Sequence, residues 1–257
     1  MKELRLIIPE RLADLDGQQI RYISGLYLQG YPENEFLLKA FLFLTGLKLV
    51  TWRKPEKDGS RWYKHRSMQD PVLISPDLMA GMINRCRFLL VPGELVPVRW
   101  IRMARARHYR LLNATFDEYL MAENYYFAYV ETKQEKHLDN LISVLYRCPW
   151  QRYQAHKIQS RAKRFRSVPA EVKTSVLMWY VGFRSYVVQR CPALFSGKKS
   201  NRPFTVRGYI NGMIHQLSNG DITIKQKLLR SPLWDALDEM DQRAIDMEAI
   251  QKQINGK

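Results

Sequence analysis

The chain contains serines, histidines and acidic residues that could carry out catalysis, but their spacing does not match a catalytic motif. Residues 196–200 read Ser-Gly-Lys-Lys-Ser, which resembles the end of a phosphate-binding loop. The full motif, G-x-x-x-x-G-K-S/T, would need glycine at position 192 and serine or threonine at position 199. The chain has Pro192 and Lys199 there, so we interpret the segment as a surface loop.

The histidines and acidic residues are also explained without catalysis. The five histidines lack the HxH or HExxH spacing of a metal site, and none is paired with a cysteine. Asp117 and Glu118 are adjacent carboxylates, which fit a helix N-terminus because its positive dipole end favours acids. Thr115 and Glu118 also have the spacing of a capping box, in which each side chain bonds to a backbone N–H at the helix start. The chain has no G-x-S-x-G nucleophile motif. We therefore predict a protein that is not an enzyme and uses no metal or other cofactor.

Cysteine usage and hydropathy indicate where the protein works. The three cysteines, Cys86, Cys148 and Cys191, are widely separated and fit neither a disulfide framework nor a zinc site. The first residues lack the basic flank and apolar run of a secretory signal. The most apolar stretch, 36–50, contains two lysines and falls short of the roughly 20 residues that span a bilayer. We expect an intracellular protein without a membrane span.

A first basic segment is a candidate binding surface. We predict a helix from Pro97 to Leu112, and at about 100° per residue four of its arginines share one face. These are Arg99, Arg102, Arg107 and Arg110. Such a face could follow a phosphate backbone or contact an acidic protein, and a solvated helix face is the alternative.

A second basic segment places an aromatic residue among its charges. It consists of Arg161, Lys163, Arg164 and Arg166, with Phe165 between them. Arginine-rich segments bind RNA, and aromatic rings stack on bases, but no RRM, KH or zinc-finger signature accompanies this one. Three interpretations stay open: contact with nucleic acid, contact with an acidic protein surface, and simple solvation.

The elements that must position these residues are mostly helical. Hydrophobic periodicity and capping residues predict helices over 17–31, 35–47, 75–87, 115–131, 134–147, 169–189, 205–219 and 231–253. Residues 48–75 are instead rich in β-formers around Asp58-Gly59, which predicts a small hairpin with 72–74 as a third strand. The predicted fold class is mostly α, with a small β-hairpin excursion near residues 48–75.

Two domains are expected. Residues 1–95 would form an N-terminal helical segment with the hairpin, and residues 96–257 an α-helical domain with a basic centre and an acidic C-terminal helix. The helix over 205–219 is the clearest amphipathic one, and its apolar stripe is a candidate wall of a binding groove. That stripe consists of Tyr209, Ile210, Met213, Ile214 and Leu217.

Charge is distributed unevenly along this basic protein. The 257 residues carry a formal charge of +16, and a hydrophobic fraction of 46% excludes low-complexity disorder. Residues Arg147–Arg207 contain fourteen basic residues and a single acid, whereas Pro232–Ile250 contains six acids and one arginine. The two regions could neutralise each other within one molecule, or pair head-to-tail between copies in a homo-oligomeric ring or stack.

The C-terminal two-thirds resembles a known group of proteins. The resemblance rests on Thr115–Tyr119, Asn140–Arg147, Gly208–His215 and Asn219–Thr223, and covers about residues 113–250. It is to helical proteins of phage and prophage tail modules that are encoded near the tape-measure gene, namely tail assembly chaperones and tail accessory proteins. It is a resemblance of pattern rather than of a diagnostic motif, and the first 100 residues lie outside it.

The resemblance implies a non-enzymatic assembly role. A chaperone of this kind shields the long helical tape-measure protein until tube subunits polymerise around it. That task requires an apolar groove with a charged rim. The helices predicted over 116–131, 134–146 and 205–219 could supply it.

The sequence therefore predicts one of two functions. The first is a phage or prophage tail-assembly or virion-associated protein that binds a tape-measure or other tail protein in the host cytoplasm. The alternative is a nucleic-acid-binding accessory protein that uses the basic region Arg147–Arg207. Affinity for nucleic acid should fall steeply with salt, whereas binding of an apolar helix should not.

Overall fold

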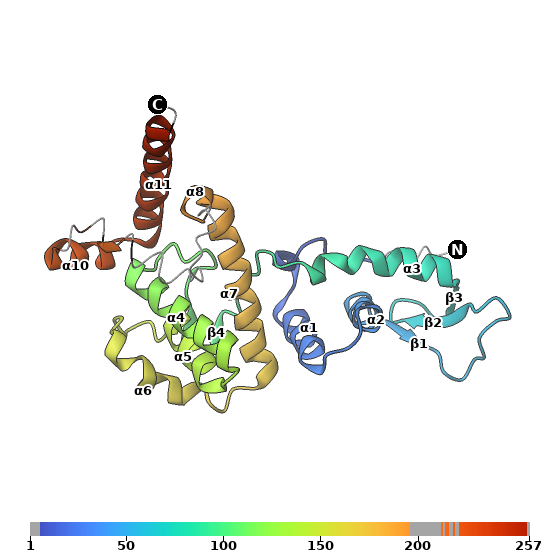
Figure 1. Cartoon of the computed structure of the whole chain (residues 1–257). Helices are drawn as coiled ribbons and strands as arrows, with labels where there is room; N and C mark the ends of the chain where they lie inside the picture. Colours follow the sequence, from blue (N-terminus) through green and yellow to red (C-terminus); the bar gives the residue numbers. More distant parts are fainter. Residues whose placement is uncertain (1–5, 196–211, 213, 216–217, 219–220, 256–257) are drawn as a thin grey trace. The chain divides into compact units, whose positions relative to one another are not determined.

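The computed structural model is mostly helical and contains two small three-stranded antiparallel sheets (Figure 1). It describes residues 6–195, 212, 214, 215, 218 and 221–255. The chain divides into two compact units. The first unit comprises Met1–Val96 and Pro169–Gly182, and the second comprises Pro97–Val168 and Phe183–Lys257. Residues 169–182, which we expected in the C-terminal domain, thus belong to the first unit.

The first unit begins with two packed helices. A short 3-10 helix, η1 (Leu12–Asp14), precedes α1 (Gly17–Gln29) and α2 (Glu33–Thr45). The Asp16 side chain accepts hydrogen bonds from the backbone of the first turn of α1, which fixes where that helix starts. Both helices end at a glycine in the left-handed conformation, Gly30 with φ 64° and Gly46 with φ 72°.

The small sheet of the first unit confirms the predicted hairpin and its third strand. The strands β1 (Leu47–Leu49), β2 (Arg61–His65) and β3 (Val72–Ile74) pair in that order. Lys48 lies opposite Lys64, and Trp62 lies opposite Leu73. Ser75 then caps α3 (Pro76–Asn84), which continues into the 3-10 helix η2 (Arg85–Leu90).

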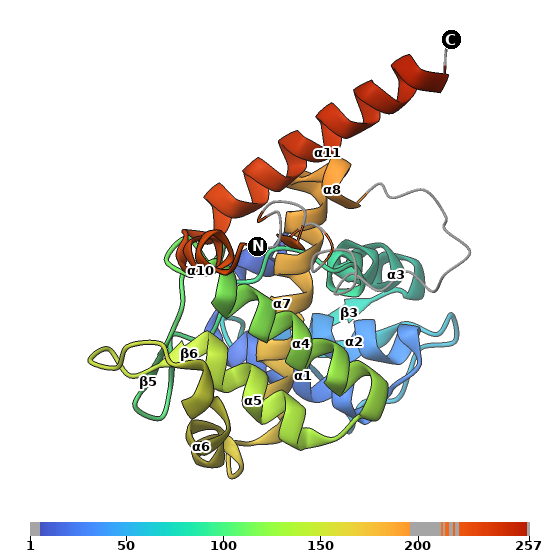
Figure 2. The ribbon, with the colours of Figure 1, turned by 60° about the vertical axis from the view of Figure 1, so that its left-hand side comes forward.

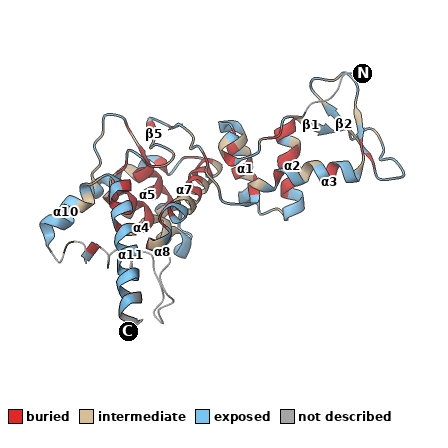
Figure 3. Ribbon diagram, turned by 90° about the horizontal axis from the view of Figure 1, so that it is seen from above, coloured by how far each residue is buried: buried red, intermediate tan, exposed pale blue. Residues whose placement is uncertain are grey.

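The core of the first unit is formed by α1, α2 and the start of α7 (Ala170–Arg190) (Figure 3). Ile23 and Phe41 are completely buried, and Trp179 of α7 is almost so. The Ser24 hydroxyl on α1 donates to the Met178 sulfur on α7 at 3.5 Å, so these two helices are in direct contact. The unit is therefore completed by a segment that lies far from it in sequence.

The second unit is built on the helix pair α4 (Phe116–Thr132) and α5 (Glu135–Leu145). The predicted capping box is present, since the Thr115 hydroxyl and the Glu118 carboxylate each bond to the other's backbone N–H. Leu138, Leu141 and Leu145 of α5 are buried. After α5 come the strand β6 (Tyr146–Arg147), the 3-10 helix η3 (Ala155–Lys157), α6 (Ile158–Ala162) and the 3-10 helix η4 (Lys163–Phe165).

The helix predicted over 97–112 is wrong. This segment forms the hairpin of β4 (Trp100–Ile101) and β5 (Ala104–Ala106), and β5 also pairs with β6. Arg102 turns the chain with φ 54°, which places Ile101 and Ala104 inside and Arg102 and Met103 outside. The spacing of the arginines suits a helix, but pairing with β6 satisfies this backbone in a sheet instead.

The C-terminal part of the second unit is helical. Its described helices are α8 (Pro192–Phe195), α10 (Ile222–Arg230) and α11 (Leu233–Asn255). The first half of α11 is anchored, because Leu237 and Met240 are buried and Asp238 pairs with Arg190 at 2.8 Å. Its second half extends away from the rest of the unit (Figure 2). Within the described residues, no helix has both the length and the hydropathy needed to cross a bilayer.

The three cysteines are free and buried. Burial raises the pKa of Cys86 to about 11 and that of Cys191 to about 11, so both stay protonated at neutral pH. We expect iodoacetamide to leave these two thiols unmodified in the folded protein and to modify them fully in urea, as measured by peptide mapping. Modification of folded and unfolded protein at equal rates would contradict this.

Candidate anion-binding pocket

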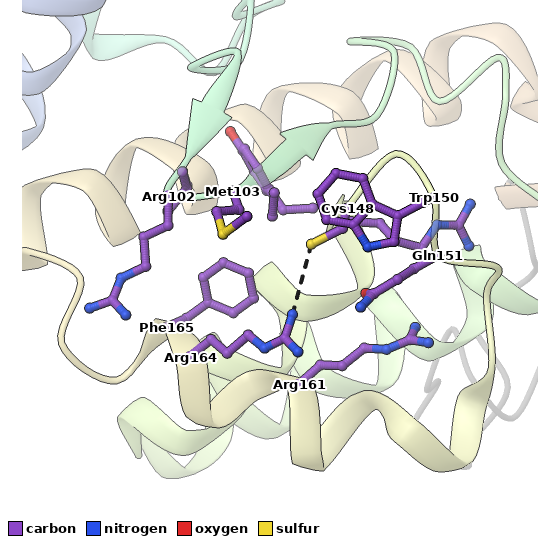
Figure 4. Close-up of a pocket in the computed structure, with 12 residues that line it drawn as sticks. Arg102, Met103, Cys148, Trp150, Gln151, Arg161, Arg164 and Phe165 are labelled. Carbon is purple, nitrogen blue, oxygen red and sulfur yellow. Dashed lines mark hydrogen bonds between the residues drawn. The ribbon is translucent and has the colours of Figure 1, made fainter.

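A pocket of about 340 Å³ opens on the second unit and is lined by four arginines. Arg147 belongs to β6. Arg102 comes from the turn between β4 and β5, Arg161 from α6 and Arg164 from η4 (Figure 4). No acidic residue lines this pocket in the described part of the chain. The charge of its lining makes the pocket a candidate site for a negatively charged group.

Two tertiary contacts bring these arginines together. Strand β6 pairs with β5, with Arg147 opposite Arg105, so the hairpin that carries Arg102 lies beside the end of α5. Helix α6 is held against α5 by the Ser143 hydroxyl, which donates to the Ile158 carbonyl at 3.1 Å. Buried Phe165 fixes the following turn, which carries Arg164.

The pocket also has an apolar side. Trp150 is 69% exposed and Met103 is 67% exposed, which is unusual for side chains of this size. Tyr146 is buried, and its hydroxyl donates to the Val98 carbonyl at 2.7 Å. An anion that also carries an apolar or planar group would thus find a partner for each part.

The charge of three of these arginines is not neutralised by a described carboxylate. Arg102 donates to the Ser167 hydroxyl, Arg161 to the Arg152 carbonyl at 3.1 Å, and Arg164 contacts the Cys148 sulfur at 3.8 Å. Each of these partners is neutral. Guanidinium groups arranged in this way can donate charge-assisted hydrogen bonds to an incoming carboxylate or phosphate.

The fourth arginine, Arg147, forms an ion pair with a buried acid. Glu118 accepts from Arg147 at 2.8 Å and from Arg107 at 2.5 Å, and the Glu118 side chain is only 4% exposed. Burial lowers the pKa of Arg147, and the positive charges of Arg107 and Arg161 lower it further, against the opposing effect of Glu118. The capping acid predicted from sequence is therefore also the counter-ion of two arginines.

The structure separates the eight basic residues that were predicted as binding residues. Arg102, Arg161 and Arg164 all line the pocket, although the Arg102 side chain points away from the other two (Figure 4). Arg107 pairs with Glu118, and the Arg110 guanidinium lies over the Tyr186 ring at 4.7 Å. The remaining three, which are exposed and lie outside the pocket lining, are Arg99, Lys163 and Arg166.

The predicted apolar stripe falls almost entirely outside the described residues. Ile214 is described and is buried. Tyr209, Ile210, Met213 and Leu217 lie outside the residues that the structure describes. The stripe therefore stays a prediction.

Three of the pocket residues that sequence reasoning did not single out matter most for its chemistry, namely Arg147, Met103 and Trp150. Arg147 was counted only as part of the basic region. Trp150 follows the Cys148-Pro149 break, so an aromatic residue placed directly after a helix stop was the available signal. Met103 could be assigned only once the turn at Arg102 was known.

Among the described residues, no group of three or more histidine, cysteine, aspartate or glutamate side chains could hold a metal ion. Comparisons of the chain with protein-family models, with curated proteins and with solved structures find no match.

Proposed function

We propose that this protein is a non-enzymatic binding protein of a phage or prophage tail module, which holds an acidic segment of a protein partner in the arginine pocket. One observation carries the binding site. Arg102, Arg161 and Arg164 line an open pocket without a described carboxylate, next to the exposed side chains of Trp150 and Met103.

This combination suits protein recognition. Arginine and tryptophan are the residue types that most often dominate binding energy at protein interfaces, and methionine is enriched there. Guanidinium groups pair with carboxylates through two parallel hydrogen bonds, which gives direction as well as attraction. The expected partner segment therefore carries carboxylates beside apolar side chains.

The helices that were expected to form an apolar groove do not offer one in the described part of the chain. The apolar residues Leu138, Leu141 and Leu145 of α5 are already buried in the second unit. The proposal therefore places the partner at the pocket rather than along α4 and α5. The tail-assembly role itself is supported by the resemblance over about residues 113–250.

Binding of single-stranded nucleic acid is a second candidate, which one observation favours. Trp150 stands exposed beside arginines, and bases stack on such rings while arginines contact the phosphates. Its affinity would fall linearly with salt on a log–log scale, with a slope set by the number of phosphates neutralised.

The pocket is tested with two fluorescent probes, a peptide of alternating glutamate and leucine and an oligothymidylate. We expect Arg161→Ala with Arg164→Ala to weaken peptide binding by at least about tenfold, because a charge-assisted hydrogen bond contributes about 1.5–3 kcal/mol. The matched control, Lys163→Ala with Arg166→Ala, removes two exposed charges outside the pocket lining and should change affinity less than about twofold.

Equal losses in the two variants would show that bulk charge, not the pocket, binds the peptide. Preference for the oligonucleotide, with a steep salt dependence that the pocket variant abolishes, would establish the second candidate instead. The assembly role is tested separately, by identifying the genes that neighbour the gene of this protein. A neighbouring tape-measure reading frame would support it, and a position away from tail genes would contradict it.

A further inference from the structure

The second unit carries, besides the pocket, a segment with the properties that the pocket requires of its ligand. The exposed half of α11 includes the run Ile245–Ile250, which reads Ile-Asp-Met-Glu-Ala-Ile. The side chains of Ile245, Met247 and Ile250 are about half exposed. Asp246 and Glu248 lie between them and are also exposed. This run presents carboxylates and apolar groups together.

The run cannot fill the pocket of its own molecule. Two views of the second unit show the last turns of α11 extending away from β6 and α6, which carry pocket residues (Figures 1 and 2). The first half of α11 is fixed by buried Leu237 and by Asp241, which accepts from the Leu194 backbone N–H at 2.7 Å. The helix is therefore not free to swing back.

We infer that the arginine pocket of one molecule binds the Ile245–Ile250 run of α11 of a second copy. This inference rests on the proposed function, in which the pocket takes an acidic protein segment, and names that segment. Asp246 and Glu248 are two residues apart and therefore lie on nearly opposite sides of the helix, so one of the two carboxylates would face the guanidiniums of the pocket, while an apolar neighbour on the same face would lie against Trp150.

Helix geometry supplies that neighbour. Residues three and four apart share a helix face, so Asp246 lies beside Ile250, and Glu248 lies beside Ile245. Each carboxylate therefore projects together with an isoleucine. Because α11 is already ordered by its anchored half, docking does not require the folding of a disordered tail, which lowers the entropic cost of binding.

The contact joins two different surfaces and is therefore heterologous. Such a contact repeats from one copy to the next, and it produces a ring if the rotation closes and an open filament if it does not. The uneven charge of the chain, basic over 147–207 and acidic over 232–250, has the polarity that this arrangement needs.

The test is a charge exchange between copies, measured by sedimentation velocity. The pocket variant is Arg161→Glu with Arg164→Glu, and the helix variant is Asp246→Lys with Glu248→Lys. We expect wild type to associate at low salt and to dissociate at high salt. Each variant alone should associate at least about tenfold more weakly, because it places like charges in the contact. An equimolar mixture should regain association, since each pocket then meets an oppositely charged helix.

A matched control, Lys163→Glu with Arg166→Glu, changes charge by the same amount outside the pocket and should associate like wild type. Circular dichroism reports folding, and a variant that fails it is replaced by Arg161→Gln with Arg164→Gln or by Asp246→Asn with Glu248→Gln, which should also weaken association. Wild type that remains monomeric at low salt, or a mixture that does not regain association, would overturn the inference. Binding of the glutamate–leucine peptide to the pocket would in that case leave the proposed function standing.

Discussion

Replacing Glu118 by alanine is expected to lower the free energy of unfolding by about 3–5 kcal/mol, because it leaves buried charge uncompensated. Arg107 and Arg147 both donate to this carboxylate, and their side chains are only 14% and 16% exposed. Arg107 Nε already lacks a described hydrogen-bond partner. The substitution also removes the acceptor for the Thr115 backbone N–H at the start of α4. Urea denaturation followed by circular dichroism measures the loss.

A control on the same helix separates this effect from a general loss of negative charge. Glu131→Ala removes an exposed carboxylate near the end of α4 and should change stability by less than about 0.5 kcal/mol. Replacing Arg107, Arg147 and Glu118 together by methionine, methionine and leucine should recover much of the stability, since no buried charge then remains. A loss below about 1 kcal/mol for Glu118→Ala would show that the two arginines reach solvent when released.

Replacing Gly182 by alanine is expected to destabilise the protein by about 2–3 kcal/mol, which is the upper part of the range that overpacking costs. A Cβ at this position of α7 would lie far inside the van der Waals distance of the Gly93 carbonyl oxygen. The obstacle is main chain, so no side-chain rotation can relieve it. The gain of about 1 kcal/mol that alanine brings to a helix interior does not offset such a clash.

The same substitution at Gly25 should have the opposite sign. Gly25 lies inside α1, and a Cβ there would meet nothing within 4 Å. Gly25→Ala should therefore stabilise the protein by about 0.4–1 kcal/mol, through helix propensity and a less flexible unfolded chain. Thermal melts of the two variants measured side by side make the comparison. Equal shifts of the melting temperature would contradict the close approach of Gly182 to Gly93.

Local signals predicted most of the fold. The Thr115 to Glu118 spacing marked the start of α4, and Ser75-Pro76 marked the start of α3, because a cap is decided by residues within one turn. The hairpin over 97–112 was missed because its strands are two and three residues long. Strands this short carry little periodicity, and their pairing with β6 depends on a partner about 40 residues away.

The candidate site was predicted only in part, because the contacts that assemble it join residues far apart in the sequence. The basic residue types were recognised, but Arg102 and the pair Arg161 and Arg164 were treated as separate segments. That these three arginines line one pocket depends on the pairing of β5 with β6 and on the packing of α6 against α5. The capping role of Glu118 was local and visible, whereas its pairing with Arg147 spans 29 residues and was not. The residue types of the site could be recognised from the sequence, whereas contacts between residues distant along the chain could not.

The discontinuity of the first unit has a consequence for synthesis on the ribosome. Residues up to 96 leave the ribosome first, but their unit also needs residues 169–182. At about 5–20 residues per second, roughly 4–17 s pass before the chain has been extended to that segment. During this interval the side of α1 that contacts Met178 of α7 has no partner to cover it. A nascent chain of this protein thus completes its N-terminal unit only after residues 97–168, about half of the second unit, have been made.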